Sequence, residues 1–279
     1  MDALTPLDSL FELERGSALP LPPELATLYG PFQLSLHPDR PTILSNFVTT
    51  LDGVVALNES DHAGGGDISG FNQHDRMIMG LLRAIAGAVI VGAGTLRSVP
   101  RHLWTAEYIY PPLAGPYQQL RTSLGKPEPP LNVIVTARGE VDLQLPVFQS
   151  SEVPALLITT THGAERLRAE RVPPSVQVSA LQNAGSLNAQ AILQAVRDVR
   201  QSDVILVEGG PQLMGDFFAG QALDELFLTL SPQIAGRDGQ VERPGLVMGK
   251  RFAPAHPLWG TLISVKRSGS HLFLRYAYP

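Results

Sequence analysis

The fold of this chain is set by residues 204–211, which read VILVEGGP. Four consecutive apolar residues, three of them β-branched, predict a strand that is buried on both faces. Glu208 follows the strand, two glycines form a turn, and Pro211 suits the first position of a helix that we expect to run to about Ala219. A strand that passes through a glycine turn into a helix is typical of α/β proteins with parallel strands.

The same alternation of strand and helix extends through most of the chain. Apolar runs predict strands, and apolar residues at helical spacing predict helices, as for Met77, Leu81 and Ile85 before Gly87. The end of the chain lacks helices and turns at Ser268-Gly269, which predicts an antiparallel hairpin. The predicted strands are 42–48, 88–91, 132–136, 155–160, 204–207 and 223–231, the predicted helices are 72–86, 187–200 and 211–219, and the hairpin is 261–276.

These elements predict one fold class: α/β, with three αβα layers around a mixed, mostly parallel sheet that has antiparallel edges. We interpret residues 41–279 as a single domain and residues 1–40 as an appendage that packs on it, with a small helix around residues 10–13. The Pro-rich residues 110–130 are expected to form a loop. The Gly-rich residues 63–66 are too flexible for a regular element, and they form either a lid or a plain surface linker.

The composition narrows the class of protein. The chain has 279 residues, of which 44% are hydrophobic and 17% charged, so a globular protein is favoured over a disordered one. The net charge of −5 argues against a nucleic-acid partner. The absence of cysteine excludes disulfides and thiolate metal sites, and the seven histidines lack a tight ligand spacing, so we expect no metal. Because no apolar run reaches the roughly 20 residues of a membrane span and no signal peptide is visible, we expect a cytoplasmic protein without membrane contact.

Three glycine-containing loops each follow a predicted strand: residues 49–53 (TTLDG), 92–95 (GAGT) and 208–211 (EGGP). Ligands of an open α/β sheet bind beyond the carboxyl ends of the strands, where such loops can share one crevice. Because glycine allows close backbone approach and free helix-terminal amides bind anions, the third loop is a candidate pyrophosphate cradle. Each loop taken alone could equally be a tight turn. The second loop is not a complete dinucleotide fingerprint, because Arg97 stands at the position of the third glycine.

Four stretches resemble, in order and spacing, the riboflavin-type pyrimidine reductase family. They read TTLDGVVA (49–56), GGGDISG (64–70), LLRAIAGAVIVGAGTLRSVP (81–100) and VILVEGGPQLMGDFFAGQALDELFLTLSPQIAGR (204–237). The resemblance implies a dihydrofolate-reductase-like fold, NADPH as the hydride donor, and reduction of the ribosyl group of a ribosylaminopyrimidine to a ribityl group. It also implies a homodimer.

Particular contacts follow from the resemblance. It places NADPH against Val48, Thr95 and residues 210–216, and the small-molecule substrate against Gly65, Arg83 and Glu208. The glycine loops add further backbone positions on the general grounds given above. The full predicted cofactor site is Val48, Thr50, Gly92, Gly94, Thr95, Gly209, Gly210, Pro211, Gln212, Leu213, Met214, Gly215 and Asp216.

One segment, residues 98–105, departs from the family pattern. Family members usually have an Asp pair before the proline that follows the second loop, whereas Ser98 and Val99 precede Pro100 here. An Arg that is thought to hold the substrate phosphate is also missing, and Arg101 is the candidate substitute. The departure leaves two other hypotheses open: a reductase of a pterin or xenobiotic on the same fold, and a non-catalytic NADPH-binding protein that regulates a partner.

Glu208 and Asp52 are the predicted catalytic residues, each with a structural alternative. Glu208 ends a buried strand, where a carboxylate needs partners, and it either binds substrate or supports the next helix by its charge. Asp52 either has a functional role, in which it orients the loop next to the nicotinamide or supplies a proton, or only makes the turn before Gly53. Arg83 lies beside an apolar helix face and either presents its guanidinium to the substrate or extends to solvent.

Overall fold

The computed structural model describes residues 4–59, 62, 64–181 and 187–279. Within them, ten strands form one sheet and two short strands form a second one. The strands are β1 (Asp8–Glu12), β2 (Ser17–Ala18), β3 (Gln33–Leu34), β4 (Thr42–Thr49), β5 (Ala88–Gly92), β6 (Leu131–Thr136), β7 (Ala155–Thr160), β8 (Val176–Leu181), β9 (Val204–Val207), β10 (Glu225–Leu230), β11 (Thr261–Ser268) and β12 (His271–Ala277). The helices are α1 (Pro23–Tyr29), α2 (Gly65–Ser69), α3 (Gln73–Ile85), α4 (Ala93–Ser98), α5 (Ala106–Ile109), the 3-10 turn η1 (Pro111–Leu113), α6 (Ala114–Ser123), α7 (Pro146–Gln149), α8 (Thr161–Ala169), α9 (Ala189–Val199) and α10 (Pro211–Ala219).

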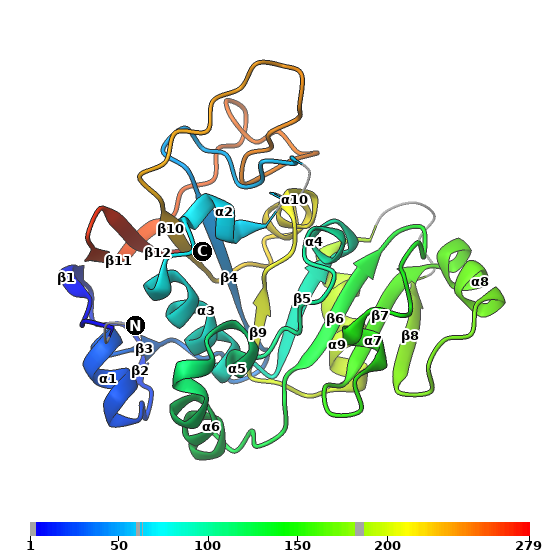
Figure 1. The fold of residues 1–279 in the computed structure, drawn as a ribbon, viewed down its shortest axis with the longest axis horizontal. Coiled ribbons are helices and arrows are strands. Elements are labelled where there is room, and N and C mark those ends of the chain that lie inside the picture. The colour runs from blue at the N-terminus through cyan, green and yellow to red at the C-terminus, as the bar shows by residue number, and fades with distance from the viewer. Residues whose placement is uncertain (1–3, 60–61, 63, 182–186) are drawn as a thin grey trace.

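The large sheet has the strand order β1-β11-β12-β10-β4-β9-β5-β6-β7-β8. All neighbours from β10 to β8 are parallel, and the pairs β10–β12, β12–β11 and β11–β1 are antiparallel. Apolar residues of α3 and α6 share one core with one face of the sheet, while α9 and α10 share a second core with the other face. Figure 1 shows α3, α5 and α6 in front of the sheet and α9 behind it. The predicted three-layer α/β class with a mixed, mostly parallel sheet is therefore confirmed.

The helices expected from periodicity form for the reason that the pattern suggested, which is the burial of one apolar face. In α3, Met77, Leu81 and Ile85 are buried, and the side chain of Asn72 caps the helix by accepting hydrogen bonds from the amides of His74 and Asp75. The predicted hairpin is present as β11 and β12, with the turn at Gly269.

Residues 10–13 were expected to form a small helix, and this was wrong. Residues 8–12 form strand β1, which pairs with β11 at the outer edge of the sheet (Figure 1). The edge of β11 offers backbone donors and acceptors that form hydrogen bonds with β1. A segment as short as residues 8–12 would gain little stability as an isolated helix. Other parts of residues 1–40 join the first core, since Leu25 and Phe32 are buried there. The domain boundary at residue 40 stays a prediction.

Three further segments differ from the expectation. Residues 110–130 contain η1 and α6, because Tyr117 and Leu120 share a buried face and Pro116 lies in the first turn, where a helix tolerates proline. Part of the Gly-rich run forms the start of α2, while Ala63 lies outside the described residues. Helix α8 and strand β8, which the pattern did not indicate, extend the sheet beyond β7. None of the helices in the described ranges combines the length and hydropathy that a membrane crossing requires.

Candidate functional site

The loops after β4, β5 and β9 lie together at the carboxyl edge of the sheet. Strand β9 lies between β4 and β5 and is parallel to both, so the three strands end at the same edge. The amide of Glu208 donates to the carbonyl of Ile90 over 2.9 Å, which ties the third loop to the second. A Cβ on Gly209 would lie 3.0 Å from the amide nitrogen of Gly92 and 2.3 Å from a methyl carbon of Leu213. Glycine is required at this position because two backbones meet there.

Helix α10 begins directly beyond this contact. Its N-cap residue, Gly210, has an extended backbone, and within the described residues no side chain caps the first turn. A Cβ on Gly210 would meet only the Thr95 hydroxyl, at 3.6 Å, and a Cβ on Gly94 would meet open space. The start of α10 therefore presents free amides beside the β5 loop, which is the arrangement that binds an anion.

Several residues that were predicted to bind the cofactor contact other parts of the protein. Leu213 and Met214 are buried in the second core, and the hydroxyl of Ser45 donates to the Met214 sulfur at 3.2 Å. Gly215 packs so tightly on the carbonyl of Met248 that a Cβ would lie 2.4 Å from it. Asp216 forms an ion pair with Lys250 at 3.1 Å. The residues whose backbone or side chain is open to a ligand are those of the first turn, such as Gln212.

Val48, Thr50 and Gly65 occupy the β4 side of the same edge. A Cβ on Gly65 would lie 3.2 Å from a methyl carbon of Val48, so α2 approaches β4 closely at this point. The hydroxyl of Thr50, which is fully buried, accepts a hydrogen bond from the amide of Val54 and closes the turn after β4. Thr50 therefore shapes the loop, while Gly65 keeps the space above Val48 free.

Arg83 and Glu208 form a buried ion pair. The Arg83 Nε donates to both carboxylate oxygens of Glu208, at 3.0 and 3.2 Å, and Nη2 donates to Oε2 at 2.6 Å. The side chains are 1% and 5% exposed. This fork geometry compensates two desolvated charges and joins α3 to the end of β9.

The remaining arm of Arg83 lies against the segment that departs from the family pattern. Its Nη1 lies 2.9 Å from the His102 Nε2 and donates to the carbonyl of Thr105 at 3.2 Å. Burial, together with the nearby cations Arg83 and Arg76, lowers the pKa of His102 to about 2. No periodicity or spacing marks His102 in the sequence. Arg101, the predicted substrate residue next to it, is exposed.

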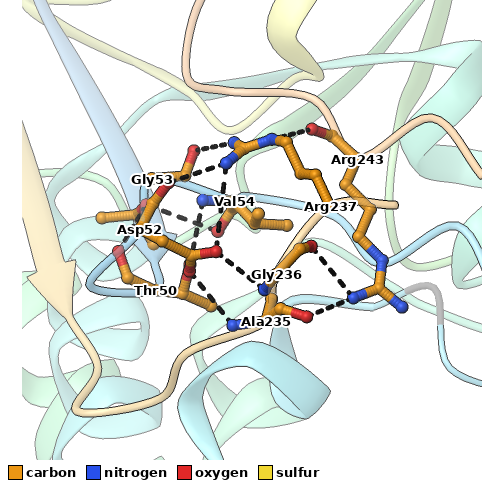
Figure 2. A network of polar contacts seen from close by, with 9 residues as sticks. Thr50, Asp52, Gly53, Val54, Ala235, Gly236, Arg237 and Arg243 are labelled. Atoms are coloured by element: carbon orange, nitrogen blue, oxygen red, sulfur yellow. Dashed lines mark hydrogen bonds and ion pairs between the residues drawn. The ribbon is translucent and has the colours of Figure 1, made fainter. Parts of the chain in front are cut away.

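Asp52 accepts hydrogen bonds from a distant segment of the chain. Its carboxylate accepts from the Thr50 hydroxyl at 2.5 Å and from the amides of Ala235 and Gly236 at 3.1 and 2.7 Å (Figure 2). These bonds, that from Thr50 first, lower the pKa of Asp52 to about 2. Such a group is ionised near neutral pH and has no proton to give.

Two arginines complete this network, as Figure 2 shows. Arg237 donates to the carbonyls of Asp52 and Gly53 at 2.9 and 3.3 Å. Arg243 donates to the carbonyls of Ala235 and Gly236 and pairs with Glu59. The carboxylate and the two guanidinium groups thus fasten the turn after β4 to the segment after β10.

The same segment, residues 231–260, continues to the start of α10. Pro244 accepts from the amide of Val55 at 3.0 Å, and the amide of Met248 donates to the carbonyl of Pro211 at 3.0 Å. In Figure 1 it passes above α2 and α10. It therefore links the Asp52 turn to the helix that carries the free amides.

Asp75 is a further buried carboxyl, which no sequence pattern marks. It lies in the first turn of α3 and bonds to the side chains of Thr229 and Ser69, and burial raises its pKa. It holds α3 against α2 and β10. No group of three or more side chains suited to a metal ion is found in the part of the chain that the structure describes.

Comparison with known proteins yields one family. The model of the RibD C-terminal domain matches residues 41–256. The riboflavin biosynthesis protein RibD of Aquifex aeolicus (strain VF5) is 26% identical over 200 residues, which are 71% of this chain and 48% of that protein. The chain thus spans about half the length of this curated relative.

Solved structures show the same fold. A pyrimidine reductase-like protein from Corynebacterium diphtheriae has a TM-score of 0.67 at 23% identity, covering 86% of this chain and 92% of its own. The diaminohydroxyphosphoribosylaminopyrimidine deaminase/5-amino-6-(5-phosphoribosylamino)uracil reductase from Thermotoga maritima has a TM-score of 0.60 at 22% identity, covering 86% and 57%. The reductase fold that the sequence resemblance implied is thereby confirmed.

The Asp52 network predicts a pH-dependent stability. Because the pKa of Asp52 is about 2 in the folded chain and about 3.9 in an unfolded one, its contribution is present above the unfolded pKa and is lost as pH falls through the folded pKa. Asp52→Asn should lower the melting temperature at neutral pH, because an amide NH2 cannot accept from the backbone. The deficit should shrink as pH falls from about 4 to about 2.

Thermal melts followed by circular dichroism check this expectation, with Asp39→Asn as the control at an exposed position. Asp39→Asn should leave the melting temperature unchanged. If Asp52→Asn melts like the unmodified protein at neutral pH, the network does not stabilise the fold.

Proposed function

Because the chain belongs to the RibD C-terminal domain family, we propose that it is an NADPH-dependent reductase that converts the ribosyl group of a ribosylaminopyrimidine to a ribityl group. The observation that carries the proposal is the glycine contact between the β5 and β9 loops, which opens onto the free amides of α10 beside the buried Arg83–Glu208 pair. The end of β9 thus offers a charged anchor on one face of the sheet edge and an anion cradle on the other.

The residues present fit a dinucleotide cofactor. The space that a Cβ on Gly210 would fill is bounded by the Thr95 hydroxyl, and the adjoining amides suit a pyrophosphate. Gly209, Gly210 and Gln212 would hold the phosphates, and Val48 would lie against the nicotinamide. When bound, the cofactor supplies the hydride, and the protein contributes binding and orientation.

Glu208 is the proposed substrate anchor. Arg83 takes part of its hydrogen-bonding capacity, and the remaining lone pairs of the carboxylate can accept from hydroxyl or amino groups of a polar substrate. All three nitrogens of Arg83 already have partners in Glu208, His102 and the Thr105 carbonyl, so we assign Arg83 to holding Glu208 in place and not to touching the substrate. This assignment narrows the substrate role expected for Arg83 from the sequence.

Asp52 is assigned a positioning role in place of proton donation. Its pKa of about 2 is unsuited to a general acid near neutral pH. By fixing residues 235 and 236, it holds the segment that reaches Pro211 and so supports the start of α10. The homodimer stays a prediction, which sedimentation velocity would test.

A substrate panel tests the proposed function. Oxidation of the nicotinamide cofactor should be fastest with NADPH and a ribosylaminopyrimidine. It should be slower when NADH replaces NADPH, and it should be absent with dihydropterins. Turnover of a pterin or another small carbonyl compound alone would instead favour the second reductase hypothesis. NADPH binding without consumption on any substrate would favour a non-catalytic binding protein.

The cradle predicts the effect of Gly210→Val. The backbone of Gly210 (φ −59°, ψ 174°) accommodates valine, and the new Cβ clashes with no neighbour, so the fold should survive. The side chain would occupy the approach to the α10 amides and weaken NADPH binding at least about tenfold. Titration calorimetry measures this, with Ala169→Val, at an exposed position in the last turn of α8, as the control. Equal NADPH affinity in both variants would remove the cradle assignment.

The buried pair predicts two separable effects of Glu208→Gln. Leaving the Arg83 charge unpaired should cost about 3–5 kcal/mol of unfolding free energy. Turnover should fall strongly while NADPH affinity persists, because the charged anchor is lost. Adding Arg83→Met removes the stranded charge, so the double variant should regain stability without regaining turnover.

Denaturant unfolding and steady-state kinetics on the single and double variants separate these effects. If the double variant recovers turnover together with stability, Glu208 supports only the structure, and the substrate anchor must be sought elsewhere.

A further inference from the structure

The side chain of His102 contacts the Arg83–Glu208 pair through Arg83. It lies in the loop between α4 and α5, and its Nε2 is 2.9 Å from the Arg83 Nη1. Its ring packs against Trp104 and Tyr108, with centroids 5.2 and 4.7 Å apart. The loop thus carries an imidazole onto the arm of Arg83 that Glu208 leaves free.

The contact fixes the tautomer of His102. A guanidinium can only donate, so Nε2 must be the acceptor and the ring proton must reside on Nδ1. A protonated ring would place a second cation against Arg83, with Arg76 also near. The Glu208 carboxylate is hydrogen-bonded to Nε and Nη2 of Arg83, and among the described residues no hydrogen bond joins it to the His102 ring. The geometry therefore selects one neutral form of the ring.

We propose that His102 is a positioning residue for substrate binding: as a neutral acceptor it holds Arg83, and through Arg83 it orients the carboxylate of Glu208. The proposal rests on the proposed function, since it assigns Glu208 to the substrate. His102 does not touch the substrate itself, and its effect is on the positions of Arg83 and Glu208. Arg83 has two partners on Nη1, His102 and the Thr105 carbonyl, which come from one loop.

Loss of the imidazole acceptor has a predictable consequence. Nη1 of a guanidinium that is 1% exposed would lose a partner, and the buried fork would shift toward other acceptors. Because Nε and Nη2 belong to the same rigid plane, a shift of Nη1 moves the two arms that orient Glu208. A small displacement of an anchor is enough to lower the rate of a positioned reaction.

Two variants separate the acceptor from the ring. His102→Phe keeps an aromatic ring for Trp104 and Tyr108 and removes the acceptor. His102→Gln loses the ring but can place an amide oxygen near Nη1. We expect His102→Phe to lower kcat/KM about tenfold or more and His102→Gln to stay within about threefold, with NADPH affinity unchanged in both.

The kinetic pattern decides between roles. If both variants lose activity equally, His102 acts as a proton donor or a structural ring and the positioning role is wrong. If neither loses activity, the role is also wrong. A gain by His102→Gln over His102→Phe, with a pH profile of unchanged shape, supports it.

A readout without substrate tests the anchoring of Arg83 separately from the proposed reaction. In 15N and 13C spectra of the histidine side chains, His102 should remain the neutral Nδ1–H tautomer from about pH 5 to about pH 9. The Arg83 Nε–H signal should be retained in His102→Gln and displaced in His102→Phe. A His102 ring that titrates in that range, or carries its proton on Nε2, would overturn the inference even if the enzyme reduces its substrate. If the spectra agree and no substrate is reduced, the proposed function fails while the anchoring of Arg83 stands.

Discussion

The buried ion pair between Arg83 and Glu208 constrains the rest of the site. Neither charge is tolerable in the core without the other, so α3 and the end of β9 must keep a fixed relation. The same guanidinium binds His102 and the Thr105 carbonyl, which adds the loop after α4 to the arrangement. Three segments that are distant in sequence are thereby held around one planar group. A fork of this kind fixes the direction as well as the distance of the carboxylate.

The end of β9 separates two chemically different compartments. Leu206 faces the core shared with α3, whereas Val207 faces the core shared with α10. Strand alternation then sends the side chain of Glu208 toward α3 and Arg83. The following glycine contact brings the chain to the other face, where α10 begins with free amides. A single turn therefore places a carboxylate on one side of the sheet edge and the uncapped start of α10 on the other.

Local patterns were sufficient for the elements that bury a regular face. Strand β9, helix α3 and the final hairpin follow from periodicity and turn residues, and so does the sheet class. The sequence did not predict β1, because its pairing depends on the edge of β11 more than 240 residues away. Helix α6 was missed because its prolines lie before it and in its first turn, where they do not break a helix. Likewise, Glu208 was expected to need a partner, but that Arg83 is the partner depends on the tertiary packing of segments 125 residues apart.

Asp52 and Glu208 show why residue type alone did not give their roles. Both are carboxylates after parallel strands at the same sheet edge, and both were expected to be catalytic. Backbone amides of a distant segment and the Thr50 hydroxyl donate to the Asp52 carboxylate and lower its pKa. These hydrogen bonds hold residues 231–260 against the turn after β4. Glu208 is held instead by one planar cation, and this leaves acceptor capacity on its carboxylate. The difference lies in the hydrogen-bond donors. Backbone amides of a distant segment bond to Asp52, whereas a single guanidinium bonds to Glu208. Of the two, only Glu208 keeps acceptor capacity, whereas Asp52 holds the turn after β4 against residues 231–260.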